Sequence, residues 1–399
     1  QGTMVATLAQ PVELIRVQRR GSAVVKCAVA EMQGWRASHE DAHTVRCNET
    51  SADVWVLDGH RGDEAARFGA EALENEFSQA QAKKGNIMPS DKKIQSGVEA
   101  VDRKLRGHLQ QQGRNAGSTV VGAFVTREMD GAYSTKLVNC GDSRAVLIRG
   151  PQERKTSAAT TSIRLPQQLE TMQQKVSWAD DASWLPSWPA ILETIDHKPG
   201  HPTERARIEA AGGKVSGGRR ARIDGNLAVS RGLGDFDFKS DRGKSVSEQK
   251  VSCVPDIYEV RGVQAGALLL LACDGLWDVM TSEEASAFIR ARLKKDPEAD
   301  LGGIAAALIR FCLRMESYDN LTVMIVHLVD GSTWANAQDE IMGFEKLGGS
   351  VDKDTRKQYQ NFLRKLQFPH DSLASIQDEE EKDRDALPAL QLVTQAVPL

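Results

Sequence analysis

Residues 268–275 read Leu268-Leu269-Leu270-Leu271-Ala272-Cys273-Asp274-Gly275, an apolar run that ends in an acidic turn. The run predicts a buried β-strand, and Asp274 falls where that strand ends. Other acidic residues also stand at one end of an apolar segment, namely Asp58, Asp142 and Asp319. Because the ends of packed strands lie along a common edge, we expect these carboxylates to converge.

Carboxylates held close together repel one another strongly unless a cation lies between them. Oxygen ligands without a matching histidine or cysteine cluster select hard ions, Mg²⁺ or Mn²⁺. Such a cluster can bind two ions about 3.5–4 Å apart and activate a water as the nucleophile. The simpler alternative is that each aspartate only caps a turn, because Asp-Gly is also a common hairpin signal.

Four further side chains extend this candidate site. The segment Asp58-Gly59-His60 places a proton donor beside a ligand, although a lone histidine is more often structural. Arg36 stands four residues before the pair Glu40-Asp41 and offers a planar, charged fork for phosphate oxygens. Adjacent residues of an extended backbone point to opposite sides, so Glu40 could reach a metal while Asp41 orients a water. The alternative for this segment is an exposed, salt-bridged strand end.

Composition excludes several broad classes of protein. The 399 residues are 40% hydrophobic and 27% charged, which is typical of a globular chain and not of a fibrous or wholly disordered one. The net charge of −4 provides no basic excess for nucleic acid, and the longest apolar run is too short to span a membrane. The six cysteines form no C-x-x-C pair, which predicts reduced thiols and a cytoplasmic or nuclear location. No signal peptide is evident.

Strand and helix signals alternate in blocks along the chain. Besides residues 268–272, strands are predicted at residues 23–29, 54–57, 119–126, 135–138, 145–148 and 322–329. Helices are predicted near residues 65–77, 203–211, 285–293 and 301–312. The pattern predicts an α+β fold in which β-sheets pack together and helices cover their outer faces.

Two segments differ from this pattern. Residues 150–193 carry few strand signals and contain Trp178, Trp184 and Trp188. We interpret them as an insertion without a pairing strand, whose tryptophans pack onto the body; an exposed partner-binding patch is the alternative. After Gly331 a spaced apolar stripe predicts a helix, made of Tyr359, Phe362, Leu363 and Leu366, and residues 378–385 form an acidic run.

A series of short motifs then occurs in one order along residues 21–329. They are Gly34-Trp35-Arg36 with Glu40-Asp41-Ala42, Asp58-Gly59-His60, Gly117-Ser118-Thr119, Asn139-Cys140-Gly141-Asp142, Asp196-His197-Lys198-Pro199, Val229-Ser230-Arg231 with Gly234-Asp235, Ala272-Cys273-Asp274-Gly275, and Asp319-Asn320-Leu321. In this order they resemble the metal-dependent protein serine/threonine phosphatases of type 2C. The resemblance implies two antiparallel β-sheets packed face to face and flanked by helices, a four-layer α/β/β/α sandwich.

The resemblance also implies an activity and a set of metal ligands. The activity is Mg²⁺- or Mn²⁺-dependent hydrolysis of phosphoserine and phosphothreonine in proteins by a metal-bound water at a binuclear carboxylate site. Asp58 would bridge two ions, Asp274 and Asp319 would bind one of them, and Glu40 and the Gly59 carbonyl would serve the other. Asp142 and Asp274 would frame a third, weaker ion, and Asp278 would stand behind these ligands.

The catalytic and substrate-binding roles come from the resemblance in the same way. Arg36 would hold the substrate phosphate, His60 would protonate the leaving oxygen, and Asp41 would act beside them. Arg222 lies in what resembles the family's flap and would touch the substrate. The resemblance implies a phosphatase domain over residues 13–330, with the insertion at about 150–193, and a helical segment with an acidic tail over 331–399. We expect a monomer that acts on phosphoproteins, with a regulatory partner at the insertion or the tail.

The chain departs from the family's pattern at two single residues. His39 fills a position that is usually apolar, and Arg61 follows His60 where a small residue is common. Two other functions stay open. A catalytically silent scaffold would bind partners through the insertion or tail, and a hydrolase of small phosphoesters would use the same site.

Overall fold

The computed structural model describes residues 7–82, 88–150, 162–166, 190–343 and 353–366. The chain divides into two compact units, residues 1–343 and 344–399. The first unit begins with the long strand β1 (Thr7–Gly21), which pairs with the short strand β18 (Glu340–Met342). The limits expected for the phosphatase domain, residues 13 and 330, both lie inside this unit.

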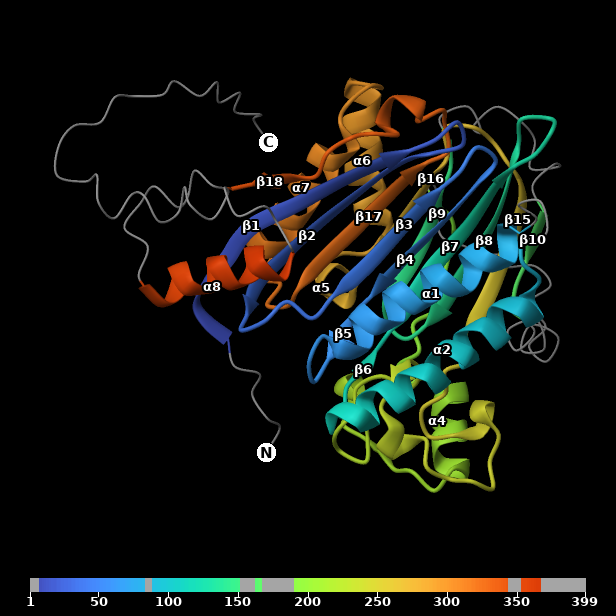
Figure 1. Ribbon diagram of the computed structural model, residues 1–399, viewed down its shortest axis with the longest axis vertical. Coiled ribbons are helices and arrows are strands. Elements are labelled where there is room, and N and C mark those ends of the chain that lie inside the picture. Colours follow the sequence, from blue (N-terminus) through green and yellow to red (C-terminus); the bar gives the residue numbers. More distant parts are fainter. Residues whose placement is uncertain (1–6, 83–87, 151–161, 167–189, 344–352, 367–399) are drawn as a thin grey trace. The chain divides into compact units, whose positions relative to one another are not determined.

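Two large antiparallel sheets form the centre of the first unit (Figure 1). The seven-stranded sheet runs, in spatial order, through β11 (Ala190–Glu193), β9 (Arg144–Ile148), β16 (Leu268–Ala272), β17 (Leu321–His327), β2 (Lys26–Arg36), β1 and β18. The six-stranded sheet runs through β10 (Ser162–Arg164), β15 (Asp256–Val263), β8 (Tyr133–Cys140), β7 (Val120–Arg127), β4 (Ser51–Leu57) and β3 (Ala42–Cys47).

Helices cover the outer face of each sheet (Figure 1). Helices α6 (Ser282–Lys295) and α7 (Leu301–Arg314) share one apolar cluster with the seven-stranded sheet. Helices α1 (Glu64–Ala82) and α2 (Asp91–Gln112) share another with the six-stranded sheet. A third cluster fills the space between the sheets. The predicted α+β fold with two packed antiparallel sheets and flanking helices is confirmed.

The apolar run at residues 268–272 shows why strands of this fold are apolar on both faces. Along β16, Leu268 and Leu270 pack into the helix-covered cluster, whereas Leu269 and Leu271 pack between the sheets. Successive side chains of a strand point to opposite faces, and here both faces are buried. The strand then passes directly into α5 (Asp274–Trp277), so Asp274 lies at the end of a rigid element.

Several strands and the helices α2 and α5 lay outside the sequence prediction. Polar residues dilute the apolar pattern of four of these elements, so the sequence did not reveal them. They are the strands β1, β3 and β15 and the helix α2. The insertion also supplies β10 and β11, which pair with β15 and β9, so the expectation that it has no pairing strand is wrong. Trp178, Trp184 and Trp188 lie outside the described residues. In the second unit the predicted helix is present as α8 (Lys353–Lys365), and the acidic run at 378–385 lies outside the described residues.

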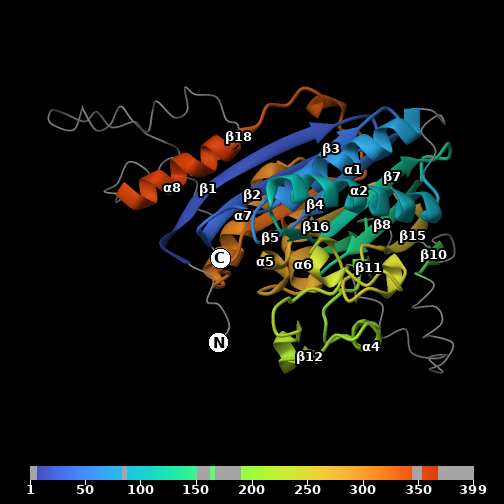
Figure 2. The same cartoon turned by 60° about the horizontal axis from the view of Figure 1, so that its bottom comes forward.

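A small lobe projects from one end of the sheets (Figure 2). It contains α4 (Pro202–Ala210) and the two-stranded hairpin of β12 (Val215–Ser216) and β13 (Arg222–Ile223). Its own apolar cluster includes Ile208 and Ile223. Beside the lobe, a three-stranded sheet joins β5 (Gly59–His60), β6 (Gly117–Ser118) and β14 (Leu233–Gly234). No helix within the described ranges is long and apolar enough to cross a membrane.

Candidate active site

The predicted carboxylates stand at the ends of strands from both large sheets. Asp58 directly follows β4, Asp274 follows β16, and Asp319 precedes β17. Thr119 fixes Asp58 in place: its hydroxyl oxygen accepts from the Asp58 N–H at 3.1 Å, and its own N–H donates to the Asp58 carbonyl at 2.9 Å. Asp142 lies in the turn between β8 and β9.

The charges of these residues act strongly on one another. Burial, followed by the negative charges of Asp274, Asp41, Asp319 and Asp142, raises the pKa of Asp58 well above its usual value. Burial and the charges of Asp142, Asp319 and Asp278 do the same to the pKa of Asp274. We call Asp41, Asp58, Asp142, Asp274 and Asp319 the aspartate cluster. Such a group of ionised side chains is costly without a cation.

The donor atoms of the aspartate cluster fit a hard divalent ion. Carboxylate oxygens of Asp41 and Asp58 and the Cys273 sulfur lie within 4.8 Å of one another. The Asp41 Oδ2 accepts from the Thr322 hydroxyl at 2.7 Å, whereas its buried Oδ1 has no hydrogen-bond partner among the described residues. An orphaned carboxylate oxygen between other carboxylates is what a cation site requires.

Cys273 is the one neighbour of these oxygens that the sequence assigned only to the core. Its sulfur donates to the Asn320 carbonyl at 3.4 Å and accepts from the Thr322 N–H at 3.2 Å. Burial, helped by the charge of Asp41, raises the pKa of Cys273 well above its usual value. The thiol therefore stays protonated, and oxygens remain the donor atoms available to a cation.

Glu40 and Asp41 contact different sides of the site, as their adjacent positions predict. The Glu40 carboxylate accepts from the Ser38 hydroxyl at 2.7 Å and from the Gly62 N–H at 2.9 Å. Asp41 instead reaches β17 through Thr322. Gly59 lies so close to Glu40 that a β-carbon on Gly59 would overlap the Glu40 carbonyl oxygen, so this contact requires glycine.

Arg36 reaches the aspartate cluster from the end of β2. Its guanidinium forms an ion pair with Asp319, although the two residues are 283 positions apart in the sequence. About a third of the Arg36 side chain, 32%, is exposed. Burial raises the pKa of Asp319, and the positive charge of Arg36 offsets only part of that shift. Arg36 thus joins the cluster to solvent, where an anionic substrate would arrive.

His60 has a carboxylate partner that the sequence reasoning missed. Its Nε2 lies 2.6 Å from Oδ2 of Asp235, whose side chain is fully buried. Burial disfavours the charged imidazole, but the charge of Asp235 and the hydrogen bond to it outweigh this and raise the pKa of His60. The motif Gly234-Asp235 was the available signal. Gly117 also matters, because a β-carbon there would overlap both the imidazole and the carboxylate.

Two of the predicted metal-site residues share one lysine. Lys198 Nζ lies 3.8 Å from Asp142 and 3.6 Å from Asp278. Burial raises the pKa of Asp142 to about 6, and the charge of Lys198 works against that shift. The Asp278 side chain is 65% exposed, so Asp278 stands outside the buried cluster and acts on it only through its charge.

Arg222 and the two departures from the family pattern take separate positions. Arg222 is exposed and donates to the Asn226 carbonyl at 2.6 Å, and no described contact joins it to the aspartate cluster. His39 is buried with its Nε2 3.9 Å from Glu31, so a buried acid accommodates this departure. Arg61 has a left-handed backbone, with φ of 61°, and its guanidinium lies 3.8 Å from Asp235. Arg61 therefore shares the partner of His60.

The lobe contains a cavity of about 250 Å³ that includes none of the predicted site residues. Its walls are Thr203, Glu204, Arg207, Arg231, Ser247, Ser252 and Val254.

Comparisons with known proteins show which family the chain belongs to. The family model for Protein phosphatase 2C matches residues 25–164 and 190–321. Protein phosphatase 1B of Mus musculus is 31% identical over 358 residues, which cover 86% of this chain and 78% of that protein. Protein phosphatase 1A of Homo sapiens is 32% identical over 315 residues, covering 76% and 70%. A phosphatase structure from Toxoplasma gondii has a TM-score of 0.61 at 22% identity, covering 82% of this chain and 98% of that chain, and so shares the fold.

The chain belongs to the protein phosphatase 2C family and is a serine/threonine protein phosphatase. Membership implies metal-dependent activity and phosphoprotein substrates. The matched segments omit most of the insertion, and they include every predicted catalytic and metal-site residue.

Proposed function

We propose that this phosphatase hydrolyses phosphoserine and phosphothreonine with two Mg²⁺ or Mn²⁺ ions held by the aspartate cluster, and with a third, weaker ion beside them. The observation that carries the proposal is the gathering of buried aspartates at the strand ends, where burial and then the neighbouring negative charges raise the pKa of Asp58 and of Asp274. Several buried carboxylates of one sign need a cation to be ionised together.

The ligand assignment follows the family pattern residue by residue. Asp58 would bridge two ions, with Asp274 and Asp319 on one side and Glu40 and the Gly59 carbonyl on the other. Asp142 and Asp274 would hold the third ion, and Asp278, which is exposed, would contribute through its charge. Bound ions would supply an activated water and neutralise charge on the phosphate.

The protein's own side chains would then handle the substrate. Arg36, which is partly exposed, would exchange its ion pair with Asp319 for the substrate phosphate, because a guanidinium binds two phosphate oxygens at once. His60, kept protonated by Asp235, would donate its proton to the leaving serine or threonine oxygen. Asp41, fixed by Thr322, would orient a water through its orphaned oxygen. Arg222 would contact the substrate from the lobe.

The proposal also covers domain limits, partners, location and oligomeric state. The phosphatase domain would cover residues 13–330, and residues 331–399 would form a helical segment and an acidic tail that could bind a regulatory partner. The Trp-rich insertion is the other candidate for such a partner. All six cysteines are free thiols, which supports a reducing location in the cytoplasm or nucleus. We propose that the chain acts as a monomer.

The direct test is hydrolysis of a phosphoserine or phosphothreonine peptide by the full chain, with and without Mn²⁺, after EDTA treatment. We expect turnover that requires the added ion and that Asp58→Asn abolishes. Full turnover after exhaustive removal of metal would contradict the proposal. A protein that binds Mn²⁺ but hydrolyses nothing would instead support the silent scaffold.

A hydrolase of small phosphoesters would use the same groups, so substrate comparison separates the two. A protein phosphatase should show a higher kcat/KM on phosphopeptides than on an alkyl phosphate such as phosphoserine alone. The exposed Arg222, outside the aspartate cluster, favours a substrate larger than one phosphate ester. Equal kcat/KM values would favour the small-ester alternative.

A further inference from the structure

The motif Asp196-His197-Lys198 has no role in the proposed chemistry, yet its three residues contact the segment from Gly141 to Arg144 that carries Asp142. Asp196 accepts from Arg144 through two hydrogen bonds of 2.9 Å. Lys198 lies 3.8 Å from Asp142. His197, between them, binds the backbone of the residue before Asp142.

His197 holds Gly141 at two points. Its Nδ1 accepts from the Gly141 N–H at 3.1 Å, and its backbone N–H donates to the Gly141 carbonyl at 2.8 Å. Because Nδ1 accepts, the ring proton lies on Nε2, which faces Asp256 at 3.2 Å. The ring orientation and tautomer are therefore fixed from both sides.

Gly141 is a position at which small movements matter. Its φ of 140° is open to glycine and strained for other residues, and a β-carbon there would overlap Thr119. Thr119 is the residue that fixes Asp58. The Gly141 backbone thus lies between His197 and Thr119, and the next residue in the chain is Asp142.

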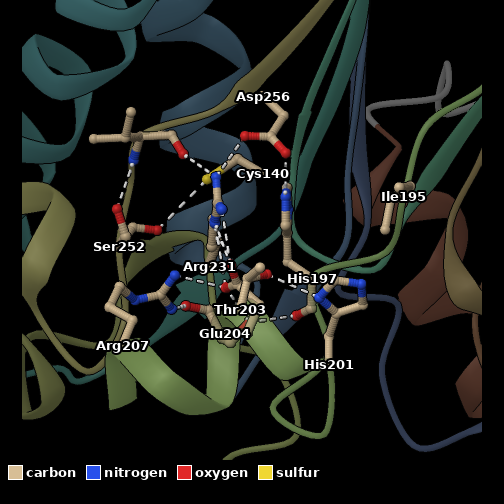
Figure 3. A network of polar contacts seen from close by, with 12 residues as sticks. Cys140, Ile195, His197, His201, Thr203, Glu204, Arg207, Arg231, Ser252 and Asp256 are labelled. Carbon is tan, nitrogen blue, oxygen red and sulfur yellow. Dashed lines mark hydrogen bonds and ion pairs between the residues drawn. The ribbon is translucent and has the colours of Figure 1, made fainter. Parts of the chain in front are cut away.

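Behind His197 stands a buried ionic network that cannot move freely (Figure 3). Asp256 accepts from Arg231 at 2.8 Å, and Arg231 donates to Glu204 of α4 at 2.7 Å. The side chains of Arg231 and Glu204 are 4% and 2% exposed. Breaking a buried network leaves unpaired charges, so it provides a rigid base for the imidazole.

We infer that His197 is a positioning residue that sets the Gly141–Asp142 turn, so that Asp142 can hold the third, weaker metal ion. The inference rests on the proposed function, because it assigns Asp142 to that ion. Groups that orient metal ligands typically change metal affinity by about 10–100-fold when they are removed. The effect should fall on the weakest ion and spare the ions held around Asp58.

Two near-isosteric substitutions of His197 each keep one of the two polar contacts of the imidazole and remove the other. In His197→Asn the amide oxygen can take the place of Nδ1 and accept from Gly141, while the contact with Asp256 is lost. In His197→Gln the amide nitrogen can take the place of Nε2 and face Asp256, while Gly141 loses its acceptor. If His197 only supports the ionic network, His197→Gln should be the less damaging substitution. If His197 positions Gly141, His197→Asn should be the less damaging one.

The experiment titrates the metal-free full chain with Mn²⁺ and measures free Mn²⁺ by electron paramagnetic resonance, alongside the melting temperature in EDTA. We expect His197→Gln and His197→Ala to weaken the weakest site by about 10-fold or more, and His197→Asn to stay closer to the wild type. His201→Ala is the matched control, because this neighbouring histidine bonds Thr203 and does not touch Gly141.

Unchanged Mn²⁺ binding in His197→Gln, or weaker binding in Asn than in Gln, would overturn the inference. If His197→Ala fails to fold, the comparison of His197→Asn with His197→Gln still tests the inference. The Asp142→Asn background provides a second measurement, because the difference between Asn and Gln at position 197 should disappear there; a difference of the same size would refute action through Asp142. A wild-type chain that binds no Mn²⁺ would defeat the proposed function itself.

Discussion

His60 and Asp235 form a buried pair in which the imidazole Nε2 lies 2.6 Å from the carboxylate oxygen, across 175 positions of sequence. The carboxylate orients the ring and favours its protonated form. A histidine supported in this way resembles a general acid more than a structural core residue. The small sheet of β5, β6 and β14 brings the two residues together, since His60 lies in β5 and Asp235 directly follows β14.

Replacing His60 by alanine should slow hydrolysis most for substrates with a poor leaving group. General acid catalysis contributes about 10²–10⁴-fold, and it contributes less when the leaving oxygen is a weak base. We therefore expect a large fall in kcat for a phosphoserine peptide and a smaller one for an aryl phosphate. Asp235→Asn should shift kcat in the same direction by less. Equal losses on both substrates would contradict the assignment.

Gly117→Ala should reproduce part of the His60 defect without touching a polar group. The added β-carbon would overlap both His60 and Asp235, so the pair must separate. Gly107→Ala in α2 is the matched control, since nothing lies within 4 Å of its β-carbon. That control should keep full activity and gain about 0.5–1 kcal/mol of stability from the helix preference of alanine. Full peptide turnover by Gly117→Ala would show that the pair is not needed.

Asp58→Asn should abolish turnover and yet stabilise the metal-free protein. Burial and neighbouring carboxylates raise the pKa of Asp58, so its ionised form opposes folding near neutral pH when no cation is present. The melting temperature in EDTA should rise by roughly 2 °C for each kcal/mol of relief. Asp278→Asn is the comparison for stability and should give a smaller rise, because this carboxylate is exposed and acts on the cluster from outside it. A lower melting temperature for Asp58→Asn would argue against repulsion in the cluster.

His327 on β17 should make the protein less stable in acid. Burial, with the positive charges of Arg290 and Lys26, lowers the pKa of His327 to about 4 from its usual 6.5. The unfolded chain then binds the proton more readily, so stability is complete above pH 6.5 and falls as the pH drops toward 4. The loss at pH 5 should be about 1–2 kcal/mol. Urea unfolding at pH 7 and pH 5 should show a smaller difference for His327→Gln; the same difference in both proteins would exclude this origin.

Truncation after Gly343 should leave metal-dependent turnover of an aryl phosphate largely intact. Residues 344–399 form a separate unit, and none of the predicted ligands lies there. Truncation after Val329 is the informative control, because it also removes Asp339, which pairs with Arg16 at 2.7 Å, and strand β18. That shorter chain should melt at a lower temperature. Loss of activity in the longer chain, if it still folds and binds Mn²⁺, would give the tail a catalytic role.

The sequence predicted the strands that are apolar on both faces and the aspartates at their ends. It located β16 at residues 268–272, as the structure has it, because a leucine run bounded by Asp-Gly leaves few other interpretations. It missed β1 and α2, since their exposed faces carry many charged residues that dilute the apolar pattern.

The sequence predicted only part of the site, and the physical reason is similar. A ligand at the end of a strand leaves a local signal, whereas a partner brought in by tertiary structure does not. Asp235 approaches His60, and His197 approaches Gly141, only because distant segments pack together. The family resemblance carried the roles of Arg36 and His60, but it did not reveal the residues that support them.

The pairing of β2 with β17 has a consequence for how the protein is made. Strand β2 joins β1 along one edge soon after synthesis, but its other edge waits for residues 321–327. The meander of β3, β4, β7 and β8 pairs within about the first third of the chain and can form long before that. During translation the nascent chain therefore exposes an unpaired apolar strand edge, a hazard for aggregation that chaperones limit. The ion pair of Arg36 must also wait, because its partner Asp319 is synthesised 283 residues later.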